Sequence, residues 1–240
     1  MKLMTLNLNL LADKHGSWEV RRERIIATIS EIAPDIVALQ AVRRLSSGQD
    51  QAQELASCLP ELPFPAFIPG ANRPDGTADG SAFLSRLPPE AVDSFQLTAE
   101  HPDDRTPRLV LVGRFRVAKS RLIIVNCHFS WIADQALQNV EETLARLDGT
   151  TPAHLMAGDM NSTPDTVAMR RLAQAGWRDA WHQLRSEEPG WTFESDRPAI
   201  RIDYIWTNPS LGARANRVET VGDSGSRLSD HLGLYADIEL

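Results

Sequence analysis

The chain has few cysteines and no long apolar run. Cys58 and Cys127 are its two cysteines, too few for a disulfide framework of the kind that holds small secreted domains together. No stretch of the sequence is apolar over the length that a membrane-spanning helix needs. Residues Met1 to Asn7 lack the apolar core and the cleavage site of a signal peptide. We therefore expect a reduced, cytoplasmic protein without a membrane span.

Basic charge is also scarce. The sequence has 25 Lys and Arg residues against 32 Asp and Glu residues, which gives a formal net charge of −7. Proteins that bind nucleic acid without sequence preference usually carry a broad positive field, so this class is disfavoured. A local basic patch on an acidic body remains compatible with these counts. The balance favours a small ligand over a long polyanion.

What is present is an ordinary globular composition. The 240 residues are 42% hydrophobic and 24% charged, and a chain of this length buries a sizeable core without staples. No internal repeat, low-complexity tract or linker interrupts it. We therefore predict one domain over residues 1–240, and no feature of the sequence implies a protein partner.

Hydrophobic patterning predicts many strands and few helices. The apolar run at 35–40 is typical of a strand buried on both faces. The segment 62–79, rich in Pro and Gly, is predicted as a long surface loop with at most one short strand, and 100–107 as a polar, mobile segment. Further strands are predicted at 1–10, 80–86, 91–97, 109–117, 121–126, 152–158, 191–193, 201–207, 215–220 and 232–239, and helices at 17–32, 49–59, 132–147 and 163–175.

This element list predicts an α+β fold. Strands joined mostly by short links favour two packed, mainly antiparallel sheets over a doubly wound parallel sheet. The predicted helices fall between the early strands and again between residues 126 and 153. We expect the helices to cover the outer faces of the two sheets.

Polar side chains occur where the predicted strands end. Carboxylates, amide oxygens and imidazoles that converge at one sheet edge would suit a hard divalent cation such as Mg²⁺, with Mn²⁺ as the alternative, and phosphoryl chemistry. Each residue alone also has an ordinary interpretation as a turn former, a helix cap or a hydrogen-bonded side chain. The residues are Asn7, His128, Asp159, Asn161, Asp203, Asp230 and His231.

Six segments carry a family resemblance. In chain order they are TLNLN at 5–9, PDIVALQ at 34–40, VNCHF at 125–129, AGDMNSTPD at 157–165, RIDYIW at 201–206 and SDHLGL at 229–234. Their order resembles the endonuclease/exonuclease/phosphatase superfamily, which includes DNase I-like nucleases, abasic-site endonucleases and sphingomyelinase-like phosphodiesterases. The resemblance spans nearly the whole chain. It implies a four-layer αββα sandwich with a divalent metal site that hydrolyses phosphoesters.

The resemblance also implies residue roles. Asn7 is similar to a metal-site amide, and Asp230 to a further carboxylate around the metal. His128 is similar to the histidine that stabilises the transferring phosphate. Asp159 corresponds to the group that orients or deprotonates the attacking water, and Asn161 to the amide that positions a phosphate oxygen.

Four further residues receive roles from the same resemblance. Asp203 and His231 correspond to a hydrogen-bonded pair in which the carboxylate fixes the imidazole tautomer and the imidazole touches the phosphate. Arg105 and Arg108 fall where the family often has an arginine that contacts phosphate. Arg108 is the preferred candidate because it begins a strand. The alternative for both arginines is a solvated loop charge.

One position departs from the pattern. Where the resemblance implies a metal-binding glutamate directly after Gln40, this chain has Ala41, which offers no ligand atom. The substitution could be an engineered Glu-to-Ala change, which we favour because the other expected polar groups are present. It could instead be a natural loss of catalysis that keeps binding. A third account is that Glu54, Asp75 or Asp79 fills the gap.

Three functions therefore compete. The first is a phosphodiesterase or nuclease with impaired activity, which would need aromatic and basic side chains around the site. The second is a phosphatase for a sugar, inositol or lipid head-group phosphate, which the acidic charge mildly favours. The third is a non-catalytic module that binds a phosphate ligand. Candidates for contacts to a polymer are Arg43, Arg44, Trp131, Trp181, Trp191 and Trp206, and core packing is the alternative for the tryptophans, which we favour at least for Trp206.

Overall fold

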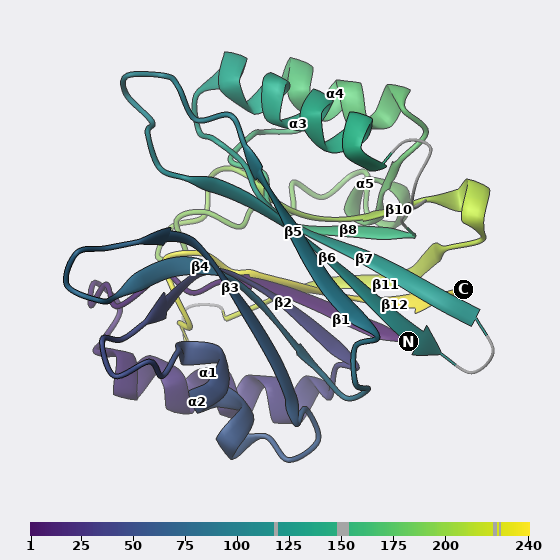
Figure 1. The fold of residues 1–240 in the computed structure, drawn as a ribbon. Helices are drawn as coiled ribbons and strands as arrows, with labels where there is room; N and C mark the ends of the chain where they lie inside the picture. The colour runs from purple at the N-terminus through teal and green to yellow at the C-terminus, as the bar shows by residue number, and fades with distance from the viewer. Residues whose placement is uncertain (118–119, 148–153, 223–224, 226) are drawn as a thin grey trace.

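Two six-stranded sheets face each other between layers of helices (Figure 1). The computed structural model describes residues 1–117, 120–147, 154–222, 225 and 227–240. In spatial order the first sheet contains β11 (Arg214–Val221), β12 (Gly233–Glu239), β1 (Lys2–Asn7), β2 (Ile36–Arg44), β4 (Ala78–Ser85) and β3 (Phe64–Asn72). The second contains β5 (Ala91–Leu97), β6 (Arg108–Val117), β7 (Ser120–His128), β8 (Leu155–Asp159), β10 (Asp203–Thr207) and β9 (Arg178–Asp179).

Helices lie on the outer face of each sheet (Figure 1). The helices are α1 (Trp18–Ile32), α2 (Gln51–Cys58), α3 (Ala133–Leu147), α4 (Val167–Gln174) and α5 (Ala180–Leu184), with a 3-10 turn at Pro209–Leu211. Helices α1 and α2 cover the first sheet and α3 and α4 cover the second, whereas the short α5 lies beside β10 and β11. None of the helices in the described ranges is long and apolar enough to cross a bilayer.

Three separate apolar clusters match the three interfaces of a four-layer sandwich. One is built from both sheets and includes Leu3, Phe83 and Leu111. The other two lie between each sheet and its covering helices. Strands β2, β8 and β10 are buried on both faces, because each contributes to the core between the sheets and to the core beneath a helix layer. The predicted αββα sandwich is confirmed.

Each sheet has one parallel pair at its centre. Within the described strands, β1 pairs with β2 and β7 pairs with β8 in parallel, and the remaining pairings are antiparallel. Helix α1 connects the first pair and α3 connects the second, as a parallel connection requires. The two pairs therefore direct the carboxyl ends of four strands to one edge of the sandwich.

Several predicted elements were wrong. The segment 62–79 is not a long loop, because it forms β3 and the start of β4, where Phe64 to Asn72 pair with Ser85 to Ala78. Its prolines are tolerated because β3 is an edge strand. The predicted helix start at 163–165 is also wrong, since Thr166 caps a helix that begins at Val167.

Other differences are smaller. The predicted strand at 191–193 is reduced to isolated bridges at Phe193. The segment 100–107 has no strand or helix, but Asp104 anchors it in the interior, so it is not merely a polar surface segment. Strand β8 begins at Leu155, and residues 152–153 of the predicted strand lie outside the described part of the chain. Two short elements, β9 and α5, were not predicted.

A buried polar network joins the two sheets. The Gln40 side chain donates to Asn126 Oδ1 at 2.7 Å and to Thr5 Oγ1 at 3.0 Å. The Asn126 amide donates to the backbone oxygens of Leu39 and Ala82, each at 3.0 Å. All three polar side chains are fully buried. Because buried polar groups cost free energy unless they are paired, this network holds the sheets in one relative position.

We expect Asn126→Ala to lower the free energy of unfolding by about 2–4 kcal/mol, because it removes the donor to two buried backbone oxygens and one of the acceptors of the Gln40 amide, which keeps its bond to Thr5. Urea unfolding followed by circular dichroism measures this change. The matched control is Asn216→Ala, at an exposed position of β11, which should change the free energy by less than about 0.5 kcal/mol. Equal effects of the two variants would contradict the role of the network.

Candidate functional site

The parallel strand pairs position the site. Asn7 ends β1 in register with Gln40 of β2, and His128 ends β7 in register with Asp159 of β8. Asn7, His128 and Asp159 are the last residues of their strands, and the strands of each parallel pair run toward the same edge of their sheet. The antiparallel strand β10 begins at Asp203, which lies opposite Asp159. The fold thus gathers residues that are more than 150 positions apart in sequence.

The Asp159 carboxylate is the centre of this group. Its Oδ2 accepts a hydrogen bond from Asn7 Nδ2 at 2.8 Å and lies 3.5 Å from His128 Nε2 and 3.8 Å from His231 Nε2. Its Oδ1 accepts a hydrogen bond from the backbone N–H of Asn161 at 2.9 Å. The carboxylate is buried, so these contacts fix its orientation.

Asp203 and His231 form the hydrogen-bonded pair that the resemblance implies. His231 Nδ1 lies 2.9 Å from Asp203 Oδ2, and both residues are buried. Thr192 Oγ1 accepts hydrogen bonds from the backbone N–H groups of Ile202 and Asp203, and the Phe193 ring packs against the imidazole with ring centroids 4.8 Å apart. These contacts hold the imidazole so that its Nε2 faces Asp159.

The two histidines beside Asp159 differ in protonation. Burial, followed by the nearby Arg108 guanidinium, lowers the pKa of His128, whose side chain is 21% exposed. Burial alone would also lower the pKa of His231, but Asp203 and Asp159 outweigh it and raise this pKa to about 10. At neutral pH the carboxylate therefore lies between a neutral imidazole and an imidazolium cation.

This protonation pattern bears on metal binding. Asp159, Asp203 and His231 have ligand atoms within 4.8 Å of one another, the spacing of a possible metal site. With no cation bound, the trio consists of two carboxylates around one imidazolium, whose Nδ1 lies 2.9 Å from Asp203. Two further oxygens lie outside this trio. Asn7 Oδ1 accepts a hydrogen bond from the Asn9 backbone, and the Asp230 carboxylate accepts one from Ser229 Oγ at 3.0 Å. These two oxygens keep acceptor capacity for a hard cation.

Ala41 lies at an irregularity in β2. Its φ is +49°, a left-handed conformation, and the pairing of β2 with β4 shifts register between Leu39 and Val42. Its carbonyl accepts the Leu10 N–H at 2.8 Å, which ties the loop after β1 to the bulge. The methyl group lines a pocket of about 600 Å³ that His128 also lines.

The carboxylates considered as substitutes for a glutamate at Ala41 lie in different places. Glu54 accepts from Trp18 Nε1 at 2.7 Å at the helix layer, and Asp75 accepts from Thr77 in an exposed turn. Asp79 lines the same pocket as Ala41, but it is paired with Arg43 at 2.5 Å and also with Arg73. Of the three, Asp79 alone reaches this pocket.

The two arginine candidates differ in surroundings. Arg108 is buried, and its Nε and Nη2 both donate to Asp104 Oδ2, at 3.2 and 2.8 Å. Ser130 Oγ donates to the same carboxylate oxygen at 2.5 Å. Arg105 is exposed and lines the pocket beside Ala41 and His128. Two of Arg108's donors are therefore already used, whereas Arg105 is the arginine that borders this pocket.

Sequence reasoning missed several supporting residues. Asp104, Thr192 and Phe193 hold the arginine and histidine groups, while Gln40 and Asn126 lie beneath the site. The available signal was polarity within apolar strands, since Gln40 and Asn126 both occur in segments that are otherwise apolar. For Asp104 and Thr192, which lie in irregular segments, no periodic pattern was present.

The four candidate tryptophans separate into two kinds. Trp181 and Trp206 are buried and belong to the core, as expected for Trp206. Trp131 is 56% exposed and follows His128 by three residues, and Trp191 is 47% exposed and precedes the Thr192 and Phe193 contacts to the histidine pair. The two exposed indoles therefore belong to segments that border the site.

We expect Asp203→Asn to lower the pKa of His231 by roughly 1–3 units in metal-free protein, because it removes the nearest negative charge. The pKa of His231 is about 6.5 in the unfolded chain and about 10 in the folded one. The ion pair therefore stabilises the fold fully below about pH 6.5, and this contribution is lost as the pH rises through about 10. NMR titration of the imidazole measures the shift. The control, exposed Asp165→Asn, should leave it unchanged, and an unchanged value in Asp203→Asn would refute the assignment.

Comparison with known proteins identifies the family and the fold. The model of the Endonuclease/Exonuclease/phosphatase family matches residues 4–231. A structure from Bacteroides vulgatus described as an endonuclease/exonuclease/phosphatase superimposes with a TM-score of 0.83 at 21% identity, over 100% of this chain and 98% of that one. A Bacteroides thetaiotaomicron mannosyl-6-phosphatase gives 0.78 at 17%, over 100% of both chains.

A human protein has the same fold. The catalytic domain of human Nocturnin with a bound sulfate anion superimposes with a TM-score of 0.75 at 21% identity, over 100% of this chain and 93% of that one. No curated protein matches the chain in sequence. Structural likeness at these identities establishes the fold, and the family model, which covers nearly the whole chain, establishes membership. The chain belongs to the Endonuclease/Exonuclease/phosphatase family, a family of phosphoester hydrolases.

Proposed function

We propose that this chain is a divalent-metal-dependent phosphoester hydrolase whose activity is impaired by alanine at position 41. The observation that carries the proposal is the position of the Asp159 carboxylate, which Asn7 and Asn161 orient and two histidines flank. A buried carboxylate with a fixed direction suits a group that orients a water molecule or accepts its proton. Family membership supports the reaction class.

The neighbouring side chains have complementary tasks in this proposal. The His231 imidazolium, held by Asp203, offers Nε2–H to the negative charge of a phosphate. Neutral His128 offers a second hydrogen bond to the same group. Asn161 is close to Asp159 in the chain. The Asn161 side-chain amide donates to the Phe129 backbone oxygen at 2.9 Å, and this bond fixes the direction of Asn161 Oδ1. Arg105, with Arg108 behind it, supplies positive charge near His128.

The proposed metal would be held by Asn7 and Asp230, with Mg²⁺ preferred and Mn²⁺ as the alternative. Bound there, a divalent cation would polarise the phosphate and stabilise the leaving oxygen. The oxygen donors at these two residues fit a hard cation, but they include a single carboxylate. Ala41 lines the adjacent pocket without a ligand atom, so affinity for the metal should be low.

A small organic phosphate is the second candidate for the substrate. None of the described residues that line the pocket between Ala41 and His128 is Phe, Tyr or Trp, and several, such as Gly70, Ala71 and Ser81, are small. Such walls suit a small polar group better than a stacked base. The likeness to a mannosyl-6-phosphatase points in the same direction. Against it, the exposed Trp131 and Trp191 would suit a larger substrate.

We expect Ala41→Glu to raise metal-dependent hydrolysis by on the order of 100-fold or more, because it adds a carboxylate to the proposed metal site. The measurement uses Mg²⁺ or Mn²⁺ with a chromogenic diester, a chromogenic monoester, DNA and RNA. The matched control is Ala41→Gln, which has nearly the same shape but no charge and should gain little. If both variants hydrolyse none of these substrates, the impaired-hydrolase proposal fails and a phosphate-binding module takes its place.

In the Ala41→Glu background, we expect Asp159→Asn to reduce the rate by about 10²–10⁴-fold, because the amide cannot accept a proton from water. Circular dichroism should show that the fold is retained. The comparison variant is Asp165→Asn, an exposed aspartate a few residues further along the chain, which should keep full activity. Retained activity in Asp159→Asn would mean that another group activates the water.

DNA binding and the two exposed tryptophans distinguish the two substrate classes. If the substrate is nucleic acid, the Ala41 protein should bind single-stranded DNA at low salt, and Trp131→Ala together with Trp191→Ala should weaken that binding by at least about 10-fold. If the substrate is a small phosphate, these changes should leave monoester hydrolysis by Ala41→Glu within about twofold. Fluorescence anisotropy and a phosphate-release assay measure the two outcomes.

A further inference from the structure

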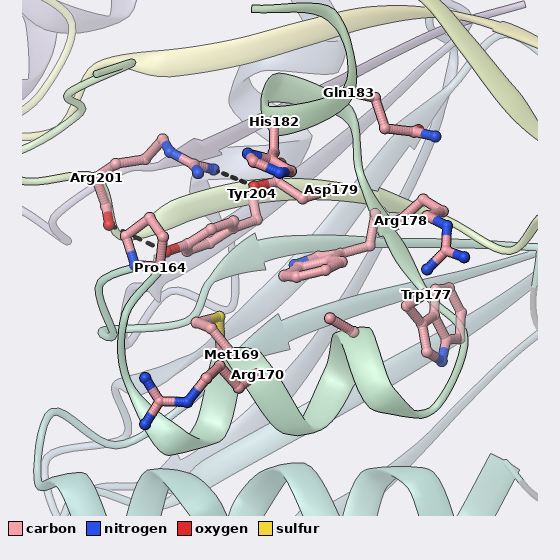
Figure 2. A pocket seen from close by; sticks show the side chains of 12 residues that line it. Pro164, Met169, Arg170, Trp177, Arg178, Asp179, His182, Gln183, Arg201 and Tyr204 are labelled. Carbon is pink, nitrogen blue, oxygen red and sulfur yellow. Dashed lines mark hydrogen bonds and ion pairs between the residues drawn. The ribbon is translucent and has the colours of Figure 1, made fainter. Parts of the chain in front are cut away.

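Arginines line several pockets of the structure, but they are not equally accessible. In the pocket between α4 and strands β9 and β10, the Arg201 side chain is paired with Asp179 and is 5% exposed (Figure 2). A ligand could not reach this guanidinium. In the pocket beside Ala41, by contrast, Arg73 and Arg105 are both exposed residues. An anion in that pocket could therefore contact them directly.

The pocket beside Ala41 extends from the site along strand β4. His128 and Ala41 line it, and Ser81 lies opposite the irregularity of β2 at Ala41. Asp79 lies two residues before Ser81 on the same face of β4, and two residues of a strand span about 7 Å. Beside Asp79, Arg73 also lines the pocket and donates from Nε to Asp79 Oδ2 at 3.0 Å. The pocket thus continues from the proposed reaction site to a guanidinium outside it.

Two irregular pairings leave the floor of this pocket without large side chains. Strand β4 is paired on both sides, with a register shift opposite residues 39–42 of β2 and another opposite residues 69–71 of β3. Gly80 lies between the two shifts, and a Cβ there would come 2.1 Å from the Ile68 oxygen, so the backbones approach closely. Bulges of this kind bend a strand and redirect its side chains. The floor consists of Gly70, Ala71, Gly80 and Ser81 and leaves space for a small polar molecule.

The charges at the Arg73 end of the pocket are unbalanced. The Asp79 carboxylate faces two guanidinium groups, because its Oδ1 lies 2.5 Å from Arg43 Nε and its Oδ2 accepts from Arg73. Arg105 adds a third guanidinium, which has no hydrogen-bond or ion-pair partner among the described residues. The nearby Asp75 lies in an exposed turn and does not line the pocket. A bound anion would compensate this positive surplus.

We propose that the Arg73 end of this pocket binds a second phosphate group of the substrate, with Arg73 as its direct partner and Arg105 adding positive charge. The substrate is then a small organic molecule with two phosphate groups, such as a sugar bisphosphate, and the phosphate that reacts lies beside His128. A guanidinium group suits this task because it binds phosphate through paired hydrogen bonds. The inference rests on the proposed function, since it names the substrate class of the same site.

The test measures binding of fructose 1,6-bisphosphate to the unmodified chain, with fructose 6-phosphate as the matched comparison. Calorimetry should give at least about 10-fold tighter binding of the bisphosphate. Arg73→Gln removes the charge from an exposed residue, and Arg43 still pairs with Asp79, so the fold should be retained. This variant should weaken bisphosphate binding by about 10-fold and leave monophosphate binding within about twofold.

The matched control is Arg178→Gln, which removes an exposed arginine from the pocket between α4 and β9 (Figure 2). Because both variants change the net charge equally, the control separates a direct contact from the general field of the protein. Bisphosphate binding by Arg178→Gln should stay within about twofold of that by the unmodified chain. Equal losses in the two variants would overturn the proposal.

A second variant adds a negative charge to the same end of the pocket. Ala71 lies two residues before Arg73 and opposite Asp79 in the pairing of β3 with β4. Ala71→Glu should therefore weaken bisphosphate binding by at least about 10-fold, and Ala71→Gln, which has nearly the same shape without the charge, should weaken it less. Equal effects of these two changes would contradict an anion site at Arg73.

The outcome for this proposal can be distinguished from that for the hydrolase. Binding by the unmodified chain requires no turnover, so it is measured separately from hydrolysis by Ala41→Glu. Equal binding of the two sugar phosphates, or no binding of the bisphosphate, would overturn the second phosphate site even if Ala41→Glu is active. Selective binding of the bisphosphate together with an inactive Ala41→Glu would support the site and reject the hydrolase.

Discussion

The hydrogen bond between Gln40 and Asn126 connects the two sheets beneath the site, whose residues come from both sheets. Gln40 lies in the middle of β2 and Asn126 near the end of β7, and the Gln40 amide donates to Asn126 Oδ1 at 2.7 Å across the inter-sheet core. A few residues away, the same alignment lets Asn7 of the first sheet reach Asp159 of the second at 2.8 Å. Apolar packing alone would allow the sheets to slide, but a fully buried amide pair tolerates little displacement. The site thus depends on a polar contact that takes no part in chemistry.

The electrostatics of the site follow from unequal numbers of partners. Two buried carboxylates raise the pKa of His231, which keeps its proton at neutral pH. Burial and the nearby Arg108 lower the pKa of His128, which is neutral. Asp159 lies between them, so a single carboxylate has a donor of fixed charge on one side and a neutral ring on the other. Catalytic sites often separate the pKa values of neighbouring groups in this way, since acid and base tasks require different protonation states. The pattern is present in this chain with alanine at position 41.

Much of this architecture could be predicted because it is written in local patterns. Continuous apolar runs such as 35–40 indicated strands buried on both faces. Polar residues at strand ends indicated the edge of the sheets where the site lies. The prediction failed where tertiary context overrode local signals. Proline and glycine in 62–79 suggested a loop, yet an edge strand has a free side that tolerates them. The ion pair of Arg108 with Asp104 could not be predicted, because polarity alone cannot distinguish a buried partner from solvent. Roles of individual residues came from the resemblance and remain proposals.

The bulge at position 41 is formed by the backbone with alanine in place. The left-handed turn at Ala41 and the bond from Leu10 to its carbonyl are present without a glutamate, so the bulge does not need that side chain in order to form. Alanine and glutamate codons can differ by one base. The glutamate form of the proposed site can therefore be one point mutation away from this chain, whether alanine at position 41 is engineered or natural.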